Sequence, residues 1–139
     1  MKLLVPSALA LAFLLATPLC AQGPDPKAPI GSTPRILADI AADRAVAEKK
    51  LNSAYEHAIH AIESSDSITR DKAKEMTLRK LKDSQTAWEQ FRRKQCAFLA
   101  SYYYEEIGSL GARAAGLWEY ESRLIKQRIE ELENPPDYF

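Results

Sequence analysis

Apolar residues recur every three or four positions between residues 34 and 134, and only two short breaks interrupt the pattern. This spacing places apolar side chains on one side of an α-helix. No alternating apolar and polar runs flank a tight turn, so nothing indicates a β-hairpin. We therefore expect an all-α protein, a small antiparallel three-helix bundle with one long central helix.

The expected first helix runs from Pro34 to about Ser64, because Thr33 is a suitable N-cap and proline is favoured at the first helical position. The second is expected from near Thr69 to about Ile107. Nearly 40 residues would span roughly 55 Å, more than the diameter of a compact domain of this size. The second helix therefore either kinks, projects beyond the bundle or pairs with another chain.

The third helix is expected to begin after Ser109 as a cap and to end near Glu133, where Asn134 and two prolines follow. The apolar stripes of the three helices are the candidate core. They comprise Leu51, Tyr55, Ala58, Ile59 and Ile62, then Leu81, Trp88 and Leu99, with Phe91 and Phe98 at the edge, and finally Leu117, Leu124, Ile125 and Leu132.

The first 21 residues have the pattern of a secretory signal peptide: Lys2, an apolar run from Leu3 to about Ala16, and small residues before Ala21. The alternative is a lipoprotein anchored through Cys20. Residues 22–33 are rich in proline and glycine, and we expect a flexible, extended linker there. Residues 34–134 would then form the helical domain and residues 135–139 a C-terminal tail. We expect an exported protein, periplasmic or secreted, with no stable membrane insertion after cleavage.

Charge and motifs exclude several function classes. Lysine plus arginine equals aspartate plus glutamate at 19 each, so the basic excess of a dedicated nucleic-acid binder is absent. Nucleotide-binding glycine motifs, catalytic serine motifs and zinc-protease motifs do not occur. His57 and His60 have metal-ligand spacing, but helical geometry turns them away from the apolar stripe, which is typical of a solvated face. We therefore expect neither an enzyme nor a cofactor or metal.

Two arginines are expected on buried faces and need partners there. Gln85 and Arg92 share a face with Trp88, and Arg128 lies in the centre of the third apolar stripe. Burying a guanidinium without a partner is very costly. We expect a polar network in which Arg92 and Arg128 pair with Glu48 or Glu121, while Gln85 and Asn52 complete the hydrogen bonds. Cys96 is expected either to be buried or to pair between chains.

Three separated motifs resemble the LprI-type lysozyme inhibitor family of small exported helical proteins. The motif residues are Glu48, Leu51, Asn52 and Tyr55, then Leu81, Gln85, Trp88, Arg92 and Cys96, and finally Arg128 and Leu132. The chain departs from the family pattern in three places. It has Glu48 where aspartate is usual, Arg93 where many members have aspartate, and Tyr120 near the place of a second cysteine, so the family's disulfide is missing.

The resemblance implies a protein that binds lysozyme stoichiometrically and blocks it. C-type lysozymes are basic, so an acidic patch with an aromatic anchor suits such a partner. We predict that Tyr104, Glu105 and Glu106 form this patch near the end of the second helix. The alternative is an envelope adaptor that self-associates or binds another protein through the second helix, with Phe91 and Phe98 in the contact.

Overall fold

Three α-helices make up nearly all of the described chain. The computed structural model describes residues 23–65, 71–106 and 109–135, and for residues 103–106 it describes the backbone alone. The helices are α1 (Thr33–Glu63), α2 (Asp71–Glu106) and α3 (Leu110–Glu133). No strand occurs in these residues. The expected all-α architecture is confirmed, and the ends of α1 and α3 lie within one residue of those predicted, while the predicted end of the second helix at Ile107 lies outside the described residues.

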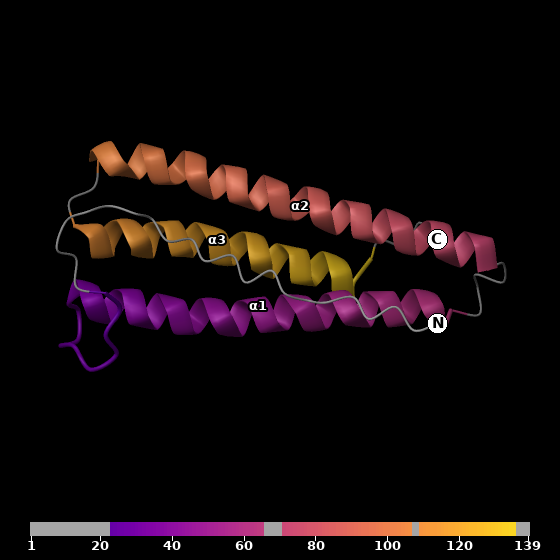
Figure 1. The fold of residues 1–139 in the computed structure, drawn as a ribbon, viewed down its shortest axis with the longest axis horizontal. Helices are drawn as coiled ribbons and strands as arrows, with labels where there is room; N and C mark the ends of the chain where they lie inside the picture. Colours follow the sequence, from indigo (N-terminus) through magenta and orange to yellow (C-terminus); the bar gives the residue numbers. More distant parts are fainter. Residues whose placement is uncertain (1–22, 66–70, 107–108, 136–139) are drawn as a thin grey trace.

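Consecutive helices run in opposite directions, so α1 and α3 point the same way and α2 points back (Figure 1). The most extensive contact is between α1 and α3, and α2 lies against this pair. The helix α2 is unbroken over 36 residues, so it does not break at a kink. It extends past the C-terminal end of α3, which agrees with the expected alternative that the second helix projects beyond the bundle (Figure 1).

Local residues explain where the helices begin and end. The Ser109 hydroxyl accepts a hydrogen bond from the backbone N–H of Ala112 at 3.2 Å, as a capping serine should. The expected cap of α1 is wrong by one residue: Ser32 is the N-cap, it makes no side-chain cap bond, and Thr33 is already helical. The helix start proposed at Thr69 lies outside the described residues.

The segment before α1 is folded back rather than extended. The backbone N–H of Asp25 donates to the carbonyl of Pro34 at 3.0 Å, and the Arg35 guanidinium donates to the carbonyl of Pro26. Gly31 has a φ of 81°, a left-handed conformation that glycine adopts without steric cost. The turns at residues 26–32 bring this stretch onto the start of α1.

The buried core is small and lies between α1 and α3. Its fully enclosed hydrophobic members, among the described residues, are Leu51, Ala54, Ile125 and Leu132. Leu81 and Trp88 of α2 pack against this cluster while remaining partly exposed. None of the helices in the described residues is both long and apolar enough to cross a membrane.

Candidate functional site

A buried arginine links α3 to α2. Only 8% of Arg128 is exposed, and its three donor nitrogens each have an acceptor. Nε donates to Gln85 Oε1 at 3.1 Å, Nη2 to Ser84 Oγ at 3.0 Å and Nη1 to Glu131 Oε2 at 3.1 Å. The expected acidic partner was Glu48 or Glu121, and this is wrong. Glu131 lies one helical turn away on α3 itself, so it reaches Arg128 without crossing the bundle.

A second arginine links α2 to α1. Arg92 Nη1 lies 2.7 Å from Glu48 Oε1, which confirms the expected pairing with Glu48. The Arg92 guanidinium also lies 5.0 Å from the centre of the Trp88 ring, and that of Arg128 lies 6.0 Å from the same ring. Both distances suit cation–π attraction. Trp88 therefore stands at the junction of the two arginine systems.

The expected role of Asn52 is wrong, because this side chain is exposed. Asn52 follows Leu51 directly, and neighbouring helical positions point about 100° apart. The Ser84 hydroxyl accepts a hydrogen bond from Arg128 instead, and this contact was not expected from the sequence. Gln85 is buried as expected, and its Nε2 donates to Glu89 Oε1 at 3.3 Å.

A further arginine pair, not expected from the sequence, links α1 to α3. Arg44 Nη2 lies 2.5 Å from Glu121 Oε2, and its guanidinium lies 5.4 Å from the centre of the Trp118 ring. Arg44 precedes Glu48 by four residues, so both lie on one face of α1. This spacing could have indicated that Arg44 lies beside the network, since Glu48 was already expected to belong to it.

Cys96 lies close to these charged pairs. Burial raises the pKa of the thiol, the Glu121 carboxylate raises it further, and the Arg92 and Arg44 guanidinium groups partly offset the rise. A raised thiol pKa means less of the reactive thiolate near neutral pH. Cys96 is a free, half-buried thiol within the single chain. Tyr55 is affected similarly: burial and then the Glu89 carboxylate raise the pKa of its hydroxyl.

Most motif residues thus meet where the three helices touch. Leu51 and Leu132 are buried hydrophobic residues, Gln85 and Arg128 are buried polar residues, and Trp88 packs against them. Tyr55, Leu81, Arg92 and Cys96 are half-buried around this junction, and Glu48 lies at its edge. This arrangement holds the three helices together.

The surface of α2 carries large exposed apolar side chains. Phe91 is 46% exposed, Phe98 63% and Tyr102 54%. The first two were expected at the edge of the buried stripe, and they lie on its outer side. Residues 91, 98 and 102 follow one another at spacings of seven and four, so they form a stripe along one side of α2. We call these three residues the aromatic stripe.

The predicted lysozyme-contacting residues occupy the last turn of α2. Helix α2 includes Tyr104, Glu105 and Glu106 in its backbone, while their side chains lie outside the described part of the structure. Four further acids of the C-terminal third are exposed on α3, namely Glu119, Glu130, Glu131 and Glu133, whereas Glu121 is half-buried and Asp137 lies outside the described residues.

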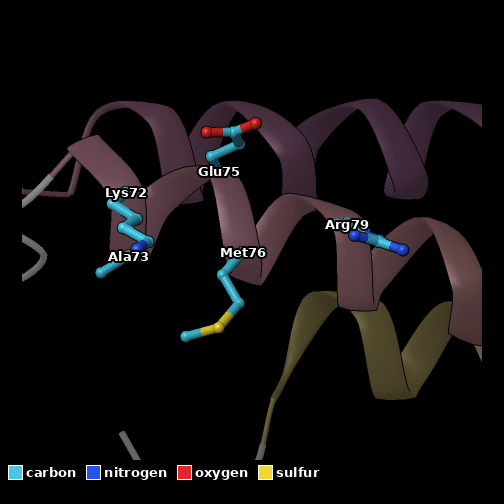
Figure 2. Close-up of a pocket in the computed structure, with 5 residues that line it drawn as sticks. All are labelled: Lys72, Ala73, Glu75, Met76 and Arg79. Carbon is cyan, nitrogen blue, oxygen red and sulfur yellow. The ribbon is translucent and has the colours of Figure 1, made fainter.

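Neither a metal centre nor an enclosed ligand site is formed by the described residues. His57 and His60 are exposed, and no group of three metal-binding side chains occurs in the described ranges. An open depression of about 430 Å³ lies at the start of α2, lined by Lys72, Ala73, Glu75, Met76 and Arg79. All five side chains come from that one helix, and Glu75 and Met76 point in opposite directions (Figure 2).

Comparison with known proteins gave one family match. The family model described as "Lysozyme inhibitor LprI" matches residues 25–132. The match includes the folded-back segment from Asp25 onward and ends at the buried Leu132. No curated protein and no solved structure matched the chain.

Proposed function

Because the chain belongs to the LprI lysozyme inhibitor family, we propose that it is an exported protein that blocks lysozyme by stoichiometric docking. The observation that carries this proposal is the family match over residues 25–132, which takes in all three helices. Export is supported by the signal-peptide pattern of residues 1–21. An inhibitor that works by docking needs a stable surface rather than reactive groups, and the arginine network supplies such a scaffold.

The proposed contact is the C-terminal end of α2, with Tyr104 as aromatic anchor and Glu105 and Glu106 as acids. Aromatic residues dominate binding energy at the centres of interfaces, and complementary charge speeds the encounter. The exposed acids on α3 extend the negative charge over the C-terminal third of the chain. The inhibitor would cover the basic substrate cleft and exclude the cell wall from it.

The experiment is a cell-wall clearing assay with purified protein from Gln22 onward against C-type and g-type lysozymes. We expect inhibition that saturates near one inhibitor per enzyme and weakens with added salt, because surface charges are screened. Tyr104→Ala is expected to reduce inhibition, and His57→Ala on the exposed face of α1 serves as the matched control. The absence of inhibition at large excess over either lysozyme would contradict the proposal.

A second function is favoured by the aromatic stripe. Large exposed apolar side chains in a row are typical of protein contacts. The chain would then be an envelope adaptor that binds a protein partner, or itself, through α2. Replacing Phe91 and Phe98 together by serine separates the two functions. Unchanged lysozyme inhibition with a lost protein complex would favour the adaptor.

A further inference from the structure

The three helices are held together in two different ways. The four buried hydrophobic residues of the described chain all belong to α1 and α3. The buried residue that α2 contributes in this part of the chain is a polar one, Gln85. The contact between α1 and α3 therefore contains the buried apolar core, beside the partly exposed Arg44–Glu121 pair, whereas α2 adds no buried hydrophobic side chain to that core.

Polar contacts join α2 to both of the other helices. Arg92 pairs with Glu48 of α1, and Gln85 and Ser84 accept hydrogen bonds from Arg128 of α3. Two partly exposed hydrophobic residues, Leu81 and Trp88, complete the contact with the core. We call the side chains of Glu48, Arg92, Gln85, Ser84 and Arg128 the polar latch.

Opening has different consequences for the two kinds of contact. When a latch bond breaks toward solvent, water replaces the lost partner, so most of its interaction energy is recovered. When apolar surface is exposed, water gives no such compensation. Separation of α2 from the pair therefore costs less than separation of α1 from α3.

We propose that α2 opens as a unit while α1 and α3 stay paired, and that the polar latch controls how often this happens. Proteins commonly open in such contiguous units at free energies below that of global unfolding. In the open form, the part of the core that Leu81 and Trp88 cover becomes accessible. This inference concerns the motion of one helix and does not depend on lysozyme as the partner.

Native-state hydrogen exchange of the full chain tests this proposal. We expect amides in residues 81–99 to exchange about ten-fold faster, or more, than amides in residues 47–58 and 121–132. Units that open separately differ in their opening free energies and therefore in their exchange rates. Exchange in α2 should also depend more weakly on urea, because partial opening exposes less surface than global unfolding.

The variant Glu48→Gln removes the charge from one latch residue and keeps its shape. It is expected to speed exchange in α2 several-fold and to leave the core segments of α1 and α3 unchanged. The matched control is Asp39→Asn, which removes the charge from the exposed Arg35–Asp39 pair within α1. This control should leave exchange in α2 at the wild-type rate.

Two results would overturn the proposal. The first is equal exchange in all three helices, with Glu48→Gln speeding them together, because the bundle would then open only as a whole. The second is fast exchange in α2 that Glu48→Gln does not alter, because the latch would then not control the opening.

Discussion

At the scale of single residues, the buried arginines decide how the helices fit. Each of the three guanidinium nitrogens of Arg128 has an acceptor, and these acceptors lie on two helices. Removing one partner of a buried polar contact leaves the other unsatisfied, which costs more than the bond itself contributes. The sequence showed that such partners were needed, since Arg128 lies in an apolar stripe.

The variant Arg128→Met tests this reading of the network. It leaves Gln85 Oε1 buried without its donor, so we expect the free energy of unfolding to fall by about 2 kcal/mol. The control is Arg123→Met on the exposed side of α3, where the guanidinium lies 5.9 Å from the centre of the Tyr120 ring. Urea unfolding monitored by circular dichroism gives both values. Equal stability of the two variants would show that the network contributes nothing.

Cys96 provides a second residue-scale prediction. Its folded-state pKa is raised, mainly by burial, so the thiolate is disfavoured in the folded protein. The resulting stabilisation is fully present below the unfolded pKa and is lost as pH rises through the higher folded value. Alkylation rates measured against pH should therefore give a higher midpoint for native protein than for protein in urea. Glu121→Gln should move the native midpoint down, and a native midpoint below that of the unfolded chain would rule out the burial effect.

At the scale of elements, the start of α3 lies very close to the start of α1. A Cβ atom at Gly111 would lie 3.2 Å from Ile36 Cδ1 and 3.2 Å from Thr33 Oγ1, whereas one at Gly116 would have no neighbour within 4 Å. Both glycines are in the same helix. The close approach at Gly111 shows why a glycine is suited to the place where α3 begins beside α1.

The two glycines therefore form a matched pair for substitution by alanine. Alanine favours a helix over glycine by about 1 kcal/mol, so Gly116→Ala should raise stability by roughly that amount. Gly111→Ala gains the same propensity but must displace Ile36 and Thr33, so its net effect should be smaller or destabilising. Thermal unfolding of both variants measures the difference. A larger gain from Gly111→Ala would contradict the close packing.

At the scale of the whole molecule, helix length sets an elongated shape. The 36 residues of α2 span about 54 Å, and α1 and α3 lie along it (Figure 1). An elongated bundle has a large surface for its volume, which fits the small core and the exposed aromatic stripe. Such a shape presents a long side to a partner.

Small-angle scattering of the protein from Gln22 onward measures this shape. A compact chain of that length would have a radius of gyration of roughly 13–14 Å. A thin rod as long as α2 has a radius of gyration of about 16 Å from its length alone, so we expect a higher value than for a compact domain. The forward scattering shows whether the protein is a monomer. A monomer with a radius of gyration near that of a compact chain would mean that α2 does not remain extended.

Sequence alone determined the helices, their approximate ends and the direction of the chain, because these depend on local spacing, caps and breaks. It also determined that Arg92 and Arg128 needed polar partners within the bundle, and it paired Arg92 with Glu48 correctly. The motifs further indicated the family that the match over residues 25–132 shows.

Only the tertiary structure decided which groups satisfy one another. Arg128 contacts Gln85, Ser84 and Glu131, and Arg44 pairs with Glu121. The spacing of residues along each helix does not predict either set of partners. Periodicity gives the direction of each side chain about its own helix, but not the rotation and offset of one helix against another. Those depend on how the side chains of all three helices pack, which also left Asn52 and Phe98 facing solvent.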